Sequence, residues 1–311
     1  MPALRLPRRP RAAHLALPLL LLAALPVPAH TQAPPPPPPP PRAAIPPLGV
    51  PGSTHVVDVG GRRLNAVVYG TGSPAVVLVS GFGAPQANWN AVVPALAAVT
   101  TVVTYDRAGV GESELGTLPA HGRQSAADLH ALLLALGVPR PCVLVGHSYG
   151  GRVVRLFAAA YPADTAGLVL EESGHEDTLD AQLEAVSGAD RETLERMAAS
   201  FRTPRPDPRT EQDYMPVTVE QLRASGPLPA VPLVVISAAS RGGGLPPVFS
   251  PAGKQAIEEV AVKMQEKLVT LVPGAEHVVV EGAGHNVHID RPEAVSAPIV
   301  AMVRRLRAKE A

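Results

Sequence analysis

One serine of this chain lies where a nucleophile is expected. Residues 146–151 read Gly-His-Ser-Tyr-Gly-Gly and contain the pattern G-x-S-x-G around Ser148. The apolar run at 142–145 predicts a buried strand just before it, and the stretch 149–160 predicts an apolar helix just after it. A serine on such an abrupt turn projects from the edge of a sheet, and the helix N-terminus directs partial positive charge toward it. We therefore expect Ser148 to be a nucleophile rather than only a helix cap.

A serine hydroxyl reacts only when a base removes its proton, and histidine is the usual base near neutral pH. His285 follows the last predicted strand in the glycine turn 282–284, at the sheet edge where Ser148 is expected, and it is the predicted base. His147 is interpreted as structural, because it would point elsewhere from the turn. His288 is interpreted as a loop histidine, because no convincing set of further metal ligands accompanies it.

Four motifs in order resemble those of the α/β-hydrolase superfamily, and the resemblance extends from about Ser53 to the C-terminus. They are the serine motif, residues 80–83 (Ser-Gly-Phe-Gly), residues 105–113 (Tyr-Asp-Arg-Ala-Gly-Val-Gly-Glu-Ser), and Gly284-His285 before Asp290-Arg291-Pro292-Glu293. Residues 80–83 are similar to the family's oxyanion loop, although Ser80 stands where a histidine is frequent. The resemblance implies an oxyanion hole made by the backbone N–H groups of Tyr149 and Phe82. Asp106 and Arg107 are interpreted as ties between loops.

The acid that orients the histidine has three candidates. Many relatives carry it after the strand predicted here at 233–236, but residues 237–244 contain no carboxylate. The preceding strand ends in Glu171 and Glu172, whose side chains should point to opposite faces, so at most one can serve. Relatives with the acid on this strand match at Glu172, which is the predicted acid, with Glu171 and Asp177 as alternatives. The chain order serine, acid, histidine is that of the superfamily.

The elements that would hold these residues alternate along the chain. Short apolar runs predict strands at 56–59, 66–69, 75–79, 102–105, 142–145, 168–170, 233–236 and 277–280. Helices are predicted at 87–97, 125–136, 149–160, 251–271 and 292–306. The alternation indicates an α/β fold with a mostly parallel, doubly wound sheet. The first two strands have no helix between them and are expected to form an antiparallel edge.

From Gly174 to Ala230 the alternation stops. This segment contains only helix candidates, at 179–186, 191–201 and 219–224, and the prolines 204, 206 and 208. Such a long excursion between two strands predicts a helical cap, about residues 174–230. We expect it over the carboxyl edge of the sheet, where open α/β sheets bind ligands.

The N-terminal segment has the composition of an export signal. Residues 1–33 contain no acidic residue, and four arginines precede the leucine-rich run 15–25. Small residues at Ala29 and Ala33 offer two cleavage positions. This layout predicts a signal peptide over 1–33, export to the periplasm or the medium, and no membrane span after cleavage.

Proline dominates the residues that follow. Eight consecutive prolines at 34–41 predict a stiff polyproline II linker, which we extend over residues 34–52. The predicted folded domain is therefore 53–311, a length within the range of one α/β domain.

Composition limits the classes of function. The 27 basic and 27 acidic residues cancel, and signal removal would leave 23 basic against 27 acidic residues, so nothing indicates binding to nucleic acid. The single cysteine, Cys142, excludes an intramolecular disulfide and any multi-cysteine metal centre. The sequence contains no dinucleotide-binding or P-loop pattern. We expect no cofactor and no metal, and no oligomeric state is indicated.

The expected activity is hydrolysis of a carboxylic ester or related small-molecule acyl substrate. Ser148 would form an acyl-serine, and water activated by His285 would release the acid. The same residues could cleave an amide or a carbon–carbon bond, or transfer the acyl group, because substrate choice would reside in the cap. A non-catalytic binding protein on the same scaffold is a further alternative, which predicts loss of a triad member.

Overall fold

The computed structural model describes residues 49–202, 210–240 and 245–310. The predicted signal peptide and the predicted linker as far as residue 48 lie outside these residues, as do the prolines at 204, 206 and 208. Among the helices of the described ranges, none has the length and apolar character that crossing a bilayer requires.

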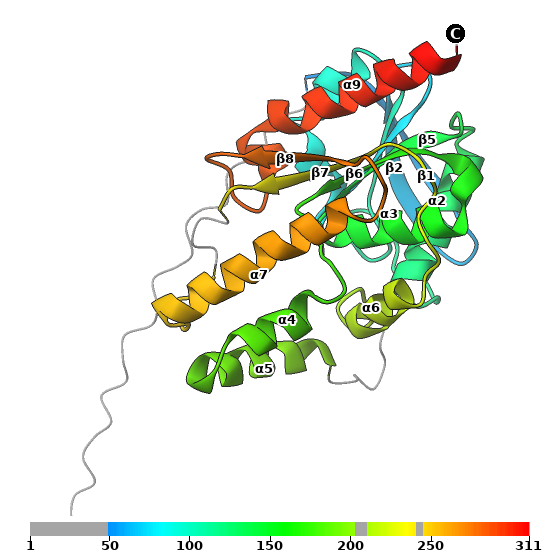
Figure 1. Cartoon of the computed structure of the whole chain (residues 1–311). Coiled ribbons are helices and arrows are strands. Elements are labelled where there is room, and N and C mark those ends of the chain that lie inside the picture. Colours follow the sequence, from blue (N-terminus) through cyan, green and yellow to red (C-terminus); the bar gives the residue numbers. More distant parts are fainter. Residues whose placement is uncertain (1–48, 203–209, 241–244, 311) are drawn as a thin grey trace, which may run out of the picture. The chain divides into compact units, whose positions relative to one another are not determined.

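Eight strands of the described chain form one sheet in the order β1-β2-β4-β3-β5-β6-β7-β8 (Figure 1). Their bounds are Gly52–Asp58, Arg63–Tyr69, Val76–Val79, Val102–Tyr105, Cys142–His147, Thr165–Glu171, Leu233–Ala238 and Glu276–Val280 for β1 to β8. β2 pairs antiparallel with both β1 and β4, and all other neighbours are parallel. The predicted mostly parallel sheet with an antiparallel edge is confirmed.

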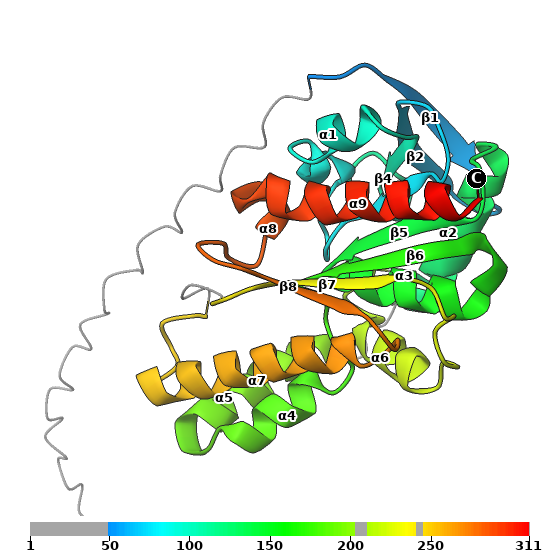
Figure 2. The same cartoon turned by 45° about the horizontal axis from the view of Figure 1, so that its top comes forward.

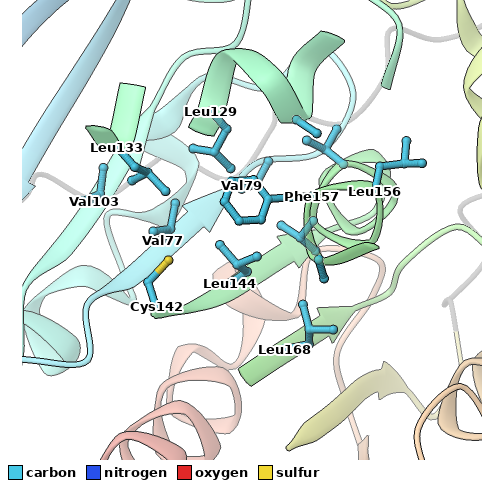
Figure 3. Close-up of a cluster of buried hydrophobic side chains, with 14 of the residues drawn as sticks. Val77, Val79, Val103, Leu129, Leu133, Cys142, Leu144, Leu156, Phe157 and Leu168 are labelled. Carbon is cyan, nitrogen blue, oxygen red and sulfur yellow. The ribbon is translucent and has the colours of Figure 1, made fainter. Parts of the chain in front are cut away.

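Helices cover both faces of the sheet, because alternate strand residues point to opposite sides. Val77 and Val79 of β3 face one core, and Val76 and Leu78 face the other. Figure 3 shows the first core, in which α2 (Gly122–Ala135) and α3 (Tyr149–Ala160) lie against the strands. The second core is covered by α1 (Val93–Ala97), α8 (Val287–Asp290) and α9 (Pro292–Glu310). Each Val or Leu so buried stabilises the folded protein by about 1.5–3 kcal/mol, and the two cores hold the sheet from both faces.

The described residues between β6 and β7 form three helices. They are α4 (Thr178–Ala185), α5 (Gly188–Arg202) and α6 (Met215–Arg223). α4 packs against α7 (Pro251–Val269), and α6 contacts α2 and α3. Figure 2 shows α4 and α5 on the side of α7 that faces away from the sheet. Leu194 of α5 and Ile257 of α7 belong to a third, smaller buried cluster that joins these helices.

One predicted helix is wrong in its extent. In place of a single helix at 87–97, the chain forms a 3₁₀ helix, η1 (Gln86–Trp89), followed by α1 (Val93–Ala97). Pro94 explains the break, because proline has no N–H for an intrahelical bond and is tolerated only in the first turn, where it lies here. A second 3₁₀ helix, η2 (Pro162–Asp164), and the short α8 are additional to the predicted elements.

Candidate active site

Ser148 alone joins β5 to α3, and its backbone is strained. Its φ of 51° lies in the left-handed region, with ψ at −112°, a conformation that costs a non-glycine residue on the order of 1–3 kcal/mol. The turn is also very close-packed. A Cβ on Gly146 would lie 2.6 Å from the Gly150 carbonyl oxygen, and a Cβ on Gly150 would collide with the Val79 carbonyl oxygen. The two glycines of the G-x-S-x-G pattern therefore permit the sharp bend at Ser148.

Glu172 follows the last residue of β6 and is directed at the histidine loop. Its Oε2 lies 3.1 Å from Nδ1 of His285, and its Oε1 accepts a 3.0 Å hydrogen bond from the Ala238 N–H at the end of β7. The side chain is buried, and φ is 44°. Ser148 and Glu172 are the two non-glycine residues with positive φ in the described ranges. Backbone strain of this kind collects at functional sites, which makes both residues candidates for a reaction.

His285 lies in the loop between β8 and α8, with its side chain 42% exposed. With Nδ1 hydrogen-bonded to the Glu172 carboxylate, the proton is assigned to Nδ1, and Nε2 is left as the basic nitrogen. Ser148, Glu172 and His285 line one cavity of about 280 Å³. The structure therefore brings together the three residues that the sequence nominated, although His285 is more than 100 residues from the other two along the chain.

The two alternative acids have other partners. Oε1 of Glu171 accepts a 2.8 Å hydrogen bond from the backbone N–H of His288 and lies 2.7 Å from its Nδ1. Burial raises the pKa of Glu171, but the charge and hydrogen bonds of His288 outweigh it, and the pKa lies below its usual value. Asp177 is bound to Lys267 at 2.5 Å on the surface of α7. Of the three candidates, Glu172 is therefore the one directed at His285.

The interpretation of His288 as a loop histidine is wrong. The residue is buried in α8, its ring lies 4.6 Å from the Trp89 ring, and it pairs with Glu171. A signal for this pair was present, because Glu171 stands in a continuous apolar strand and a buried carboxylate requires a partner. The partner itself is 117 residues away and has no local signature.

His147 lies beneath the histidine loop and makes a structural contact. Its Nε2 donates a 2.8 Å hydrogen bond to the His285 carbonyl oxygen. Burial lowers its pKa to about 4, so the imidazole is neutral at pH 7.

His147, Glu171 and His288 each offer a ligand atom within 4.8 Å of the others, and in the described chain they are the one group with the composition of a metal site.

The loop that carries Phe82 is held from two sides. Arg107 donates to the carbonyl oxygens of Ser80 at 2.6 Å and Gly81 at 2.7 Å. Arg107 also forms a buried ion pair with Glu211, which accepts a 3.2 Å hydrogen bond from the Gly83 N–H. The interpretation of Arg107 as a tie between loops is confirmed, and its partner Glu211, in the segment between β6 and β7, was not foreseen.

Asp106 ties loops in the same way. Its two oxygens accept hydrogen bonds from the backbone N–H groups of Gln86 at 2.7 Å and Glu112 at 3.1 Å.

Phe82 itself is 43% exposed, and its ring lies edge-to-face on Tyr149 at 6.3 Å. Tyr149 opens α3, so its N–H has no partner one turn earlier within the helix. The assignment of the Tyr149 and Phe82 N–H groups to an oxyanion hole stays a prediction.

Comparison with known proteins gives one family. Residues 76–297 match the model described as alpha/beta hydrolase family. The uncharacterized protein YqjL of Bacillus subtilis is 23% identical over 230 residues, which cover 74% of this chain and 83% of YqjL. The soluble epoxide hydrolase of Corynebacterium sp. strain C12 is 37% identical over 106 residues, 33% of this chain and 36% of that enzyme.

Other similarities are shorter or show the fold alone. The chain spans 19% of the length of efuK, described as a probable transporter of Hormonema carpetanum, with 31% identity over 131 residues, which are 40% of this chain. A solved thermophilic esterase from Thermogutta terrifontis superposes with a TM-score of 0.56 at 22% identity and covers 82% of this chain and 99% of the esterase.

Proposed function

The chain belongs to the alpha/beta hydrolase family, and from this we propose that it is a serine hydrolase that cleaves a carboxylic ester or related acyl substrate. The observation that carries the proposal is the convergence of Ser148, Glu172 and His285 on one cavity. The left-handed backbone of Ser148 and Glu172 supports it, because such strain persists where a site requires it.

The proposed reaction uses these groups in two steps. His285 Nε2 accepts the proton of Ser148 as its Oγ attacks the substrate carbonyl, and the imidazolium then protonates the leaving group. Glu172 holds the Nδ1 proton and stabilises the imidazolium. The backbone N–H groups of Tyr149 and Phe82 would stabilise the oxyanion, each by about 2.7–4 kcal/mol. Water, deprotonated by His285, then hydrolyses the acyl-serine and releases the acid.

The choice of bond follows from the nucleophile. Relatives include proteins whose descriptions name an epoxide hydrolase, a fluoroacetate dehalogenase and a carbamate hydrolase. Serine attack on an epoxide or on a carbon–halogen bond would leave an ether on Ser148, which a histidine-activated water does not cleave. Attack on an acyl carbon leaves an ester on Ser148, and histidine-activated water cleaves that ester. Ser148 therefore favours esters and other acyl compounds.

We also propose the roles of the remaining segments. Residues 53–311 would form one hydrolase domain, with 174–230 as a cap over the site. Thr178 and Gln182 of α4 support the cap, because they line the same cavity as Ser148. Residues 1–33 would direct export to the periplasm or the medium, as their composition predicts.

A fluorophosphonate probe tests the proposed nucleophile. The probe should label the protein once, at Ser148, and Ser148→Ala should abolish labelling and lower kcat for p-nitrophenyl butyrate by about 10⁴-fold or more. Ser173→Ala is the matched control, since Ser173 lines the same cavity. The Ser173→Ala protein should still be labelled at Ser148. Labelling of the Ser148→Ala protein at another residue would refute the assignment.

A further inference from the structure

Among the residues that the structure describes, Arg152 has no carboxylate partner, although it is partly removed from water. It lies on α3 four residues after Ser148. Its Nε donates to the Gly174 carbonyl oxygen at 3.4 Å, and its Nη1 lies 2.8 Å from the Met215 sulfur. Both are weak contacts for a guanidinium, and a thioether is a poor acceptor. Burial lowers the pKa of Arg152, as expected for a cation without a counter-ion.

Neighbouring arginines are paired. Arg155, three residues later on the same helix, binds Glu176 with two hydrogen bonds of 2.7 and 3.0 Å. Arg223 of α6 binds Asp180 and Glu220 at 2.5 and 2.9 Å. The acidic side chains around Arg152 are therefore engaged by other cations, and the charge of Arg152 remains available to a ligand.

The position of Arg152 connects it to the reaction. It lines the 280 Å³ cavity with Ser148 and His285, and it also lines a second cavity of about 420 Å³ among α4, α5 and α6. It is the one described residue that lines both cavities. The second cavity is lined by the charged residues Glu176, Asp180, Glu220 and Arg223, which are all in ion pairs, and by apolar walls: Leu179, Leu194, Met197, Ala198, Met215, Pro216 and Val219. Such walls lower the local dielectric and strengthen any ion pair formed at their edge.

We propose that Arg152 binds an anionic group of the substrate. The proposal rests on the proposed hydrolase function and names its substrate class: an acyl compound with a carboxylate a few carbons from the scissile carbonyl. Ser148 and Arg152 lie about 6 Å apart along the helix axis, which suits a short spacer. A carboxylate at this point would receive charge-assisted hydrogen bonds from the guanidinium and compensate its charge.

Matched esters test this specificity. Mono-p-nitrophenyl glutarate and p-nitrophenyl valerate both have five-carbon acyl chains. The glutarate chain ends in a carboxylate, and the valerate chain ends in a methyl group. The wild type should prefer the glutarate ester by about 10- to 100-fold in kcat/KM. Arg152→Gln should bring the ratio close to one, and Arg152→Lys should keep part of it. Arg191→Gln, which removes an exposed arginine of α5 whose partner Glu195 lines neither cavity, should retain the wild-type ratio.

A third ester and a binding measurement complete the test. 4-Carboxyphenyl valerate carries its carboxylate on the leaving half, so an Arg152-dependent preference for it would place the anion there. Isothermal titration of Ser148→Ala protein with monomethyl glutarate should show binding that the added Arg152→Gln change removes.

The outcomes separate the two proposals. Hydrolysis of the valerate ester without an Arg152-dependent preference for either anionic ester would overturn the role of Arg152 and leave the hydrolase intact. If no ester is hydrolysed, the proposed function fails, and the titration alone then decides whether Arg152 binds the anion.

Discussion

At the residue scale, two adjacent glutamates at the end of β6 serve different histidines. Glu171 is the last residue of the extended strand and reaches His288 inside the core. Glu172 has a left-handed backbone, and its carboxylate reaches His285 at the cavity with Ser148. The change of backbone conformation between neighbours thus separates a buried pair from a pair that can take part in a reaction.

The two glutamates should therefore respond differently to neutralisation. Glu172→Gln should lower kcat for p-nitrophenyl butyrate by about 10⁴-fold, because the amide favours the wrong imidazole tautomer. Glu171→Gln should change kcat by less than about tenfold and instead lower the unfolding free energy, since breaking a buried pair costs about 3–5 kcal/mol. Asp177→Asn is the exposed control. Large loss of kcat in Glu171→Gln, with Glu172→Gln active, would transfer the role to Glu171.

At the scale of elements, one buried ion pair joins the segment between β6 and β7 to the loop after β3. Arg107 fixes the carbonyl groups of Ser80 and Gly81, and Glu211 fixes both Arg107 and the Gly83 N–H. Phe82 lies between these anchors. The position of the proposed oxyanion donor therefore depends on a residue from a distant segment of the chain.

Glu211→Gln should act on kcat more than on KM. Loss of the charge loosens Arg107 and the loop, and a small displacement of an oxyanion donor costs about 10- to 100-fold in rate. Steady-state kinetics with p-nitrophenyl butyrate, together with thermal unfolding, separates this effect from simple destabilisation. Glu220→Gln, an exposed glutamate of α6, is the control. A stable Glu211→Gln protein with unchanged kcat would show that the pair only holds the fold.

The elements were more predictable than their contacts. All eight strands follow from apolar runs, and the limits of β4 at Val102–Tyr105 match the prediction, because burial on both faces gives a continuous apolar signal. β1 begins four residues earlier than predicted, because its exposed residues have no such signal. Glu211 as partner of Arg107, and His288 as partner of Glu171, depend on tertiary contacts that span more than 100 residues. Local periodicity carries no information about such pairs.

At the scale of the whole molecule, buried ionisable groups make stability depend on pH. His147 has a pKa of about 4 in the folded protein because it is buried, against about 6.5 when unfolded. Between these values the unfolded chain binds more protons, so acidification favours unfolding. The lowered pKa of Glu171 acts in the same direction, because below about 4.5 its carboxylate takes up a proton more readily in the unfolded chain than in the folded protein.

Urea unfolding at pH 7 and pH 5 measures the contribution of His147. Its protonation in the unfolded state should account for about 2 kcal/mol of the stability lost between these pH values. His147→Gln should be less stable than the wild type at pH 7, and the difference should narrow by about this amount at pH 5. His55→Gln, at an exposed position of β1, should follow the wild type. Equal pH dependence in wild type and His147→Gln would show that His147 is not the group responsible.

The left-handed turn at Ser148 has a consequence for the durability of the protein. Glycine adopts that conformation without penalty, so a glycine at position 148 would discard the hydroxyl and relax the bend in one step. A screen for heat resistance that ignores turnover should accordingly enrich dead variants at this position. At this position the residue that is needed for activity is not the one that is best for stability, and the sequence has the serine.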